Sequence, residues 1–78
     1  MQTVSVDSSV IAEVGHDPDI NVLEVHFHNG HVHQYFLVPR WRYDALMRAQ
    51  SIGAYFNREI RDVYRSTRID TSVSGLDT

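Results

Sequence analysis

Four of the five histidines in this 78-residue chain lie in one short stretch and are the side chains best suited to metal chemistry. They are His26, His28, His31 and His33. Neutral imidazole is a common metal ligand, and zinc sites use three or four ligands of this kind. The chain has no cysteine, so thiolate sites are excluded. We keep zinc as an alternative but expect no cofactor, because the sequence indicates no supporting partners for such ligands.

A β-hairpin must position these histidines, because Asn29-Gly30 lies between two alternating apolar runs. This dipeptide is typical of a two-residue type I′ turn, which would place His26 opposite His33. Directly opposite residues share a face of the sheet. The predicted core face carries Leu23, Val25, Phe27, Val32, Gln34 and Phe36. The predicted open face carries Glu24, His26, His28, His31, His33 and Tyr35.

The predicted open face also has the residue types of a base-stacking surface. Imidazole and phenol rings such as those of His33 and Tyr35 can stack on the bases of single strands. Glu24 on the same face would oppose the approach of phosphate. The ordinary alternative is a solvated face, or one covered by a second copy of the chain.

Charge is divided unevenly along the chain, whose formal net charge is -3. The chain has seven arginines and no lysine, and all seven arginines lie between Arg40 and Arg68, whereas residues 1–39 contain acids and neither lysine nor arginine. The net charge argues against wrapping of nucleic acid by bulk electrostatics, but the basic half can meet phosphate locally. We select Arg58, Arg61 and Arg65 as candidate phosphate contacts.

A family resemblance, set out below, singles out three polar residues among the apolar positions of the second half, namely Ser51, Asn57 and Arg61. One hypothesis is a polar pocket at the start of a helix, where free N–H groups favour an anion. The favoured interpretation is structural: Ser51 caps a helix, Asn57 bonds to backbone, and Arg61 pairs with a sheet carboxylate such as Glu13.

The order of elements predicts an α+β fold of the form βββαα. Strands are expected at residues 9–14 and in the two arms of the hairpin, forming a three-stranded antiparallel meander. Pro39 ends the last strand, and helical spacing of apolar residues predicts helices over residues 40–50 and 54–65. Both helices would pack on one face of the sheet. Residues 9–68 form the single domain, with a loose N-terminal segment at 1–8 and a flexible tail at 69–78.

Size and composition exclude several classes of protein. There is no apolar run of membrane-spanning length and no signal-peptide pattern, so we expect a cytoplasmic protein without a membrane partner. No nucleophile–histidine–acid pattern, glycine-rich phosphate loop or metallohydrolase motif is present, and we predict that the chain is not an enzyme. A core of this size supplies only about 3–5 kcal/mol, which favours association with a second copy or another protein.

The chain resembles the KTSC domain family over residues 8–64. The matching pieces, in order, are Ser8-Ser9-Val10-Ile11, Val14-Gly15-His16-Asp17, Leu23-Glu24-Val25-His26-Phe27, Asn29-Gly30, Tyr35-Phe36-Leu37-Val38-Pro39, Leu46-Met47-Arg48-Ala49, Ser51-Ile52-Gly53-Ala54-Tyr55-Phe56-Asn57, Ile60-Arg61 and Tyr64. The family's Tyr-x-Tyr motif is His33-Gln34-Tyr35 here, and His16 stands where the family has an aromatic residue. The module occurs alone in bacteria and phages and at the C-terminus of some lysyl-tRNA synthetases, a context that implies RNA as a ligand.

Together these observations predict a small non-catalytic binding module for RNA or another nucleotide ligand. Its candidate binding residues are His33, Tyr35, Ser51, Asn57, Arg58, Arg61 and Arg65. The alternative is a homodimerising protein-interaction module. One form of this alternative is a phage-encoded protein that acts on a host protein.

Overall fold

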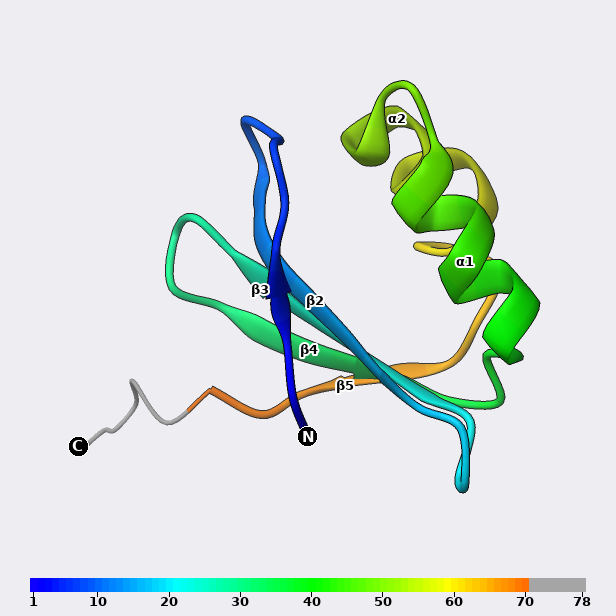
Figure 1. Ribbon diagram of the computed structural model, residues 1–78. Coiled ribbons are helices and arrows are strands. Elements are labelled where there is room, and N and C mark those ends of the chain that lie inside the picture. The colour runs from blue at the N-terminus through cyan, green and yellow to red at the C-terminus, as the bar shows by residue number, and fades with distance from the viewer. Residues whose placement is uncertain (71–78) are drawn as a thin grey trace, which may run out of the picture.

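The computed structural model describes residues 1–70, which form one antiparallel sheet with two helices on one face (Figure 1). The strands are β1 (Val4–Ser5), β2 (Ile11–Asp17), β3 (Val22–Phe27), β4 (Val32–Tyr35) and β5 (Ser66–Arg68), and the helices between β4 and β5 are α1 (Arg40–Arg48) and α2 (Ile52–Glu59). The strands lie in the order β1-β2-β3-β4-β5. No helix in this part of the chain is long and apolar enough to cross a membrane.

The predicted α+β class is confirmed, but the expected three-stranded sheet is wrong, because it has five strands. The N-terminal segment 1–8, expected to be loose, contributes β1, which pairs with β2. After α2 the chain returns along β4 and forms β5. Both added strands are two or three exposed residues long, too short to show an alternating pattern. Of the predicted tail, residues 71–78 lie outside the described residues.

The β3–β4 hairpin differs from the predicted one by a single residue of register. Its loop has three residues: the N–H of Gly30 donates to the Phe27 carbonyl, and the N–H of Phe27 donates to the His31 carbonyl. Gly30 has a φ of 94°, the left-handed conformation that closes such a loop with a bulge. Val25 therefore pairs with His33, and His26 pairs with Val32. A shift of one residue moves every side chain of β4 to the other face.

The register corrects the predicted faces of β4. Tyr35 is 3% exposed and lies in the core with Leu23 and Val25, whereas Gln34 lies on the opposite face beside Glu24. The expectation of four histidines on one face is therefore wrong. Tyr35 displaces Gln34 from the core because an aromatic ring buries much more apolar area than an amide side chain.

The core lies between the sheet and the helices. A bulge between Ile11 and Glu13 lets both Ile11 and Val14 point inward, although regular alternation would separate them. The buried cluster is Ile11, Val14, Leu23, Val25, Tyr35, Val38, Leu46, Phe56 and Ile60. Within residues 1–70 no polar or charged residue is fully buried.

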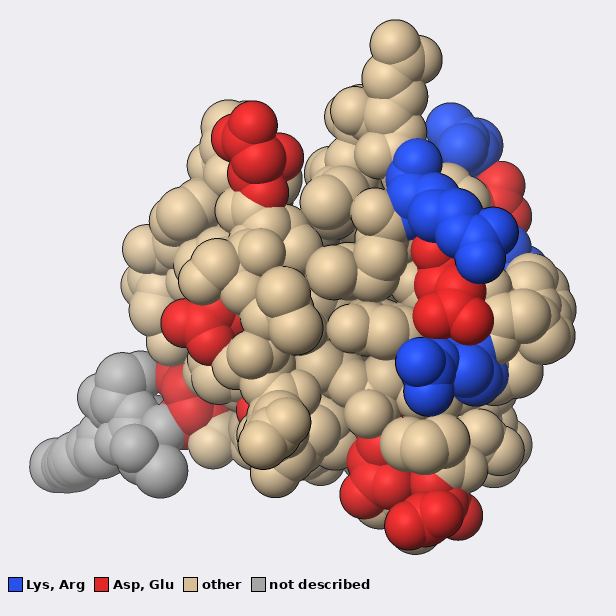
Figure 2. All heavy atoms as spheres, viewed as in Figure 1, with Lys and Arg blue, Asp and Glu red and all other residues tan. Residues whose placement is uncertain are grey.

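Both helices begin where the sequence contains a start signal. Pro39 precedes α1, and the Ser51 hydroxyl caps α2 by accepting a hydrogen bond from the N–H of Ala54 at 3.3 Å. The helices are shorter than predicted, because α1 ends at Arg48 and α2 ends at Glu59. Arginines gather over the two helices, with acidic side chains between them (Figure 2).

Candidate functional site

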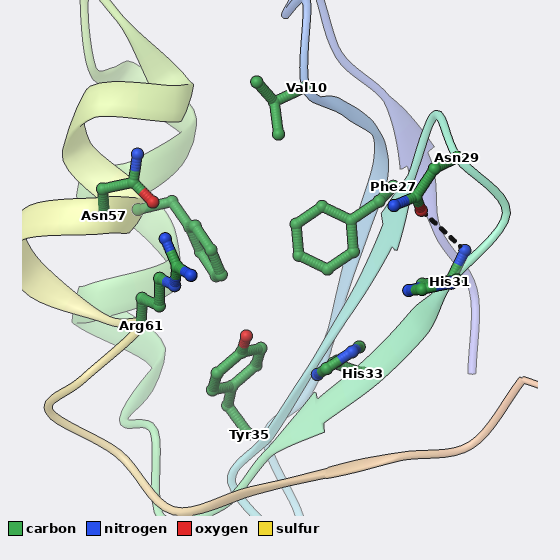
Figure 3. Close-up of a pocket in the computed structure, with 9 residues that line it drawn as sticks. Val10, Phe27, Asn29, His31, His33, Tyr35, Asn57 and Arg61 are labelled. Carbon is green, nitrogen blue, oxygen red and sulfur yellow. Dashed lines mark hydrogen bonds between the residues drawn. The ribbon is translucent and has the colours of Figure 1, made fainter.

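A cleft of about 270 Å³ lies between the β3–β4 hairpin and α2 (Figure 3). It is lined by Val10, Phe27, Asn29, His31, His33, Tyr35, Phe56, Asn57 and Arg61. Four of these are candidate binding residues from the sequence: His33, Tyr35, Asn57 and Arg61. Strand β4 supplies the first two, and α2 and the turn after it supply the others. The fold thus brings together two motifs that lie more than twenty residues apart.

Aromatic rings form the apolar part of the cleft. The ring centroid of Phe56 lies 5.4 Å from that of Tyr35 and 5.6 Å from that of Phe27, in edge-to-face contacts. Phe27 also meets His33 edge-on at 5.6 Å. These contacts hold the walls of the cleft in place.

Three rings follow one another along the β4 side of the cleft. His31, His33 and Tyr35 share a face because they are two residues apart, and successive rings are inclined by only 22°. Their centroids are 6.5 Å and 6.2 Å apart, which is the two-residue repeat of a strand rather than the distance of direct stacking. The rings of His31 and His33 are half-buried and can be reached by a flat ligand, whereas the ring of Tyr35 is packed in the core.

Two polar groups of the cleft, the Tyr35 hydroxyl and the Arg61 guanidinium, have no partner within residues 1–70. Tyr35 is 3% exposed, yet its hydroxyl points into the cleft without a hydrogen bond there (Figure 3). The Arg61 guanidinium, on the α2 side beside Asn57, forms no ion pair in this part of the chain. Buried polar groups are normally paired, so the hydroxyl of buried Tyr35 is left to solvent or to a ligand in the cleft, with the exposed Arg61 beside it.

Ionisation in the cleft is shaped by burial. Burial raises the pKa of Tyr35, against the opposing field of Arg61, so that the hydroxyl keeps its proton as a donor. Burial also lowers the pKa of His33, helped by neighbouring His31 and opposed by Asp70. At neutral pH the ring of His33 is therefore uncharged and can both donate and accept hydrogen bonds.

The remaining histidines lie elsewhere. His26 is on the opposite face of the sheet, where its Nε2 bonds to the Glu24 carboxylate at 2.7 Å. The side chain of Gln34 donates to the same carboxylate at 3.0 Å. Burial would raise the pKa of Glu24, but these two hydrogen bonds outweigh it and hold that pKa below its usual value. His28 donates to the Ser8 carbonyl at 2.8 Å.

The register separates His26 from His33 and so removes the cross-strand pair on which the zinc hypothesis depends. In the part of the chain that the structure describes, no three histidine or carboxylate side chains are placed to hold a metal ion together.

The other candidate residues lie outside the cleft. Ser51 is an N-cap, and it lines a separate, polar cleft with Ser8 and Gly53. Arg58 pairs with Glu59 at 3.0 Å, and Arg65 is exposed in the segment that leads to β5. The predicted pairing of Arg61 with Glu13 is wrong, because the Glu13 carboxylate accepts from the Thr3 hydroxyl.

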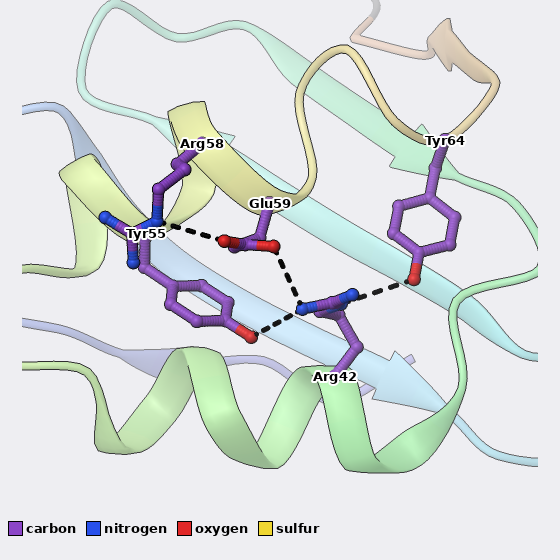
Figure 4. A network of polar contacts seen from close by, with 5 residues as sticks. All are labelled: Arg42, Tyr55, Arg58, Glu59 and Tyr64. Atoms are coloured by element: carbon purple, nitrogen blue, oxygen red, sulfur yellow. Dashed lines mark hydrogen bonds and ion pairs between the residues drawn. The ribbon is translucent and has the colours of Figure 1, made fainter.

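Sequence reasoning missed Phe27 and Phe56 as parts of the site: it places Phe27 on the core face and gives Phe56 no role in a site. It also missed a network centred on Arg42 (Figure 4). The Arg42 guanidinium donates to the hydroxyl of Tyr55 at 3.0 Å, to that of Tyr64 at 3.3 Å and to Glu59 at 3.4 Å. The two hydroxyls raise the pKa of Arg42. This network joins α1 to α2 and to the segment that follows α2.

Two known proteins are similar to this chain in sequence over most of their length. The chain is similar to an uncharacterised protein of Stutzerimonas stutzeri, with 38% identity over 90% of this chain and 100% of the relative. It is also similar to a protein of Tsukamurella paurometabola, with 31% identity over 82% of this chain and 96% of the relative.

Among solved structures, a KTSC domain protein from Yersinia pestis superimposes with a TM-score of 0.83 and 35% identity, covering 87% of this chain and 96% of the other. The KTSC domain pattern itself matches residues 7–64, which include every element from β2 to α2 and the whole lining of the cleft. The chain therefore belongs to the KTSC domain family.

Proposed function

We propose that this protein is a non-catalytic binding module that takes a nucleotide-containing ligand, as RNA or as a free nucleotide, in the cleft beside α2. One observation carries the proposal. The Tyr35 hydroxyl and the Arg61 guanidinium face the same cleft, and neither has a partner within residues 1–70. The residue types there match the two halves of a nucleotide.

The apolar half of the cleft suits a base. Bases stack on aromatic and imidazole rings, and each such contact contributes about 1–3 kcal/mol. His31 and His33 present half-buried rings on one wall, next to the buried ring of Tyr35. The polar half suits a phosphate, because arginine binds phosphate oxygens through two parallel N–H groups.

The surrounding charge makes this recognition local. The chain has a formal net charge of -3, and Arg58 is already paired with Glu59. Polyanions therefore gain little from the molecule as a whole, and binding depends on contacts inside the cleft. Binding should still weaken as salt rises, because the phosphate contact releases counterions.

The test is fluorescence anisotropy with a short labelled RNA, comparing Arg61→Gln and Tyr35→Phe with the unchanged protein. A lost arginine–phosphate contact should lower affinity at least tenfold, and a lost hydroxyl contact of about 1 kcal/mol should lower it about fivefold. Arg48→Gln is the matched control, because Arg48 is exposed on α1 and lies outside the cleft. Equal affinity for Arg61→Gln and Arg48→Gln contradicts the proposal.

Self-association is the second candidate function, and a specific surface favours it. Ile20, Leu37 and Trp41 are 61%, 79% and 59% exposed, and the loops of the first two are joined by the Val38 N–H donating to the Asn21 carbonyl. Exposed apolar groups that lie together often mark an interface, and this hydrogen bond brings the loops of Ile20 and Leu37 together. Sedimentation across a concentration series tests this, and Trp41→Gln should shift a dimer toward monomer.

A further inference from the structure

The charges and hydrogen-bond donors that line the cleft indicate which kind of phosphate group it can bind. Arg61 is the one arginine among the lining residues, and no aspartate or glutamate lines the cleft. The other polar groups are the Tyr35 hydroxyl, the Asn57 and Asn29 amides and two imidazoles. Arginine only donates, and a protonated phenol, an amide N–H₂ and an imidazole N–H also donate. The cleft is therefore rich in donors around one fixed positive charge.

The residues that surround the cleft do not add positive charge to it. Asp62 directly follows Arg61, and its field acts on Tyr35. On the β5 side, the Arg68 guanidinium bonds to both carboxylate oxygens of Asp70, at 2.6 Å and 2.9 Å. Asp7 lines the neighbouring polar cleft, which shares Val10 and Asn57 with this one. An internal stretch of RNA, which carries a charge at every nucleotide, finds no row of free cations here.

A terminal phosphate fits this lining better than a phosphate inside a chain. A phosphomonoester carries a charge of about -1.5 to -2 at neutral pH and has three strong acceptor oxygens. An internal phosphodiester carries a single charge and must continue out of the site on both sides. Several donors around one guanidinium suit the first of these groups.

Resting on the function proposed above, we propose that the cleft binds a single nucleotide through its phosphomonoester. The phosphate lies against Arg61, Asn57 and the Tyr35 hydroxyl, and the base lies against the rings of His33 and His31. Two sources present this chemistry, a free mononucleotide and the phosphorylated end of an RNA. The cleft volume of about 270 Å³ is small for a ligand site and suits one such unit rather than several.

Isothermal titration calorimetry with four uridine probes tests the proposal. Three are hexauridylates with a phosphate at the 5′ end, at the 3′ end or at neither end, and the fourth is uridine 5′-monophosphate. We expect at least one phosphorylated hexamer to bind ten or more times tighter than the unphosphorylated one. Arg61→Gln should abolish that difference, whereas Arg48→Gln should keep it. Arg61 is exposed and forms no ion pair within residues 1–70, so its removal leaves the fold intact.

The outcomes distinguish failure of the terminal-phosphate inference from failure of the proposed nucleotide binding. Equal, Arg61-dependent binding of all three hexamers overturns the terminal-phosphate inference and leaves nucleotide binding standing. No binding of any probe overturns both. Where the phosphorylated probes are preferred, the monophosphate identifies the source: affinity equal to the best hexamer indicates a free nucleotide, and affinity tenfold weaker indicates an RNA end.

Discussion

Removing the Arg42 guanidinium should destabilise the fold by a large share of its total stability. The Arg42 guanidinium also lies 4.4 Å from the Trp41 ring centroid, a contact that a methionine thioether can replace. In Arg42→Met the apolar stem stays, and the polar contacts to Tyr55, Tyr64 and Glu59 are lost. The shortest contact, at 3.0 Å, is worth about 1 kcal/mol, and the two longer ones about 0.5 kcal/mol each. The expected loss is thus about 2 kcal/mol, against the roughly 3–5 kcal/mol that a domain of this size possesses.

Urea denaturation followed by circular dichroism measures this loss, and a double-mutant cycle with Tyr55→Phe isolates the main contact. We expect a coupling energy of about 1 kcal/mol between Arg42 and Tyr55. Arg40→Met is the matched control on the same helix, because exposed Arg40 makes only a surface ion pair with Asp44 and a 5.7 Å contact with the Tyr43 ring, and its removal should cost about 1 kcal/mol or less. A loss in Arg42→Met no greater than in Arg40→Met, or a coupling of zero, refutes the reasoning.

Three further predictions concern single positions. Gly15→Ala should lower the melting temperature and expose the N-terminal segment to proteolysis, because an added Cβ would lie 2.4 Å from the Gln2 carbonyl oxygen. Leu37→Gly should raise the free energy of unfolding by up to about 1 kcal/mol in a urea titration, because Leu37 is exposed at a φ of 59°. Burial lowers the pKa of His33 from 6.5, so the unfolded chain takes the proton first and stability falls as the pH drops below about 6.5. His33→Gln should reduce that fall in melting scans across pH.

Much of the scaffold could be predicted from the sequence because the signals were local. Pro39 marks the start of a helix, Ser51 has the side chain of a helix cap, and both helices formed close to their expected positions. Strand β4 ends at Tyr35, before Pro39. Each of these inferences needs only neighbours within one or two turns of chain.

The faces of β4 could not be predicted from such neighbours. Asn29-Gly30 fits a two-residue turn, and a three-residue loop also ends in glycine, so the dipeptide alone does not decide the register. The decision comes from packing: Tyr35 against Phe56 fills the core in a way that Gln34 would not. Comparing the apolar area of the two alternative faces was the available signal. No local sequence pattern predicts strand β5, because this short segment is a strand only through its pairing with the edge of β4.

The three-residue loop of the β3–β4 hairpin also constrains how this gene can diverge. Deleting or inserting one codon there would exchange the two faces of β4, replacing His33 and Tyr35 in the cleft with Val32 and Gln34. Changing the loop by two codons would leave the faces as they are. Among descendants that keep the cleft, loop lengths should therefore differ by even numbers, and an odd change should be accompanied by an exchange of aromatic and polar residues along the strand.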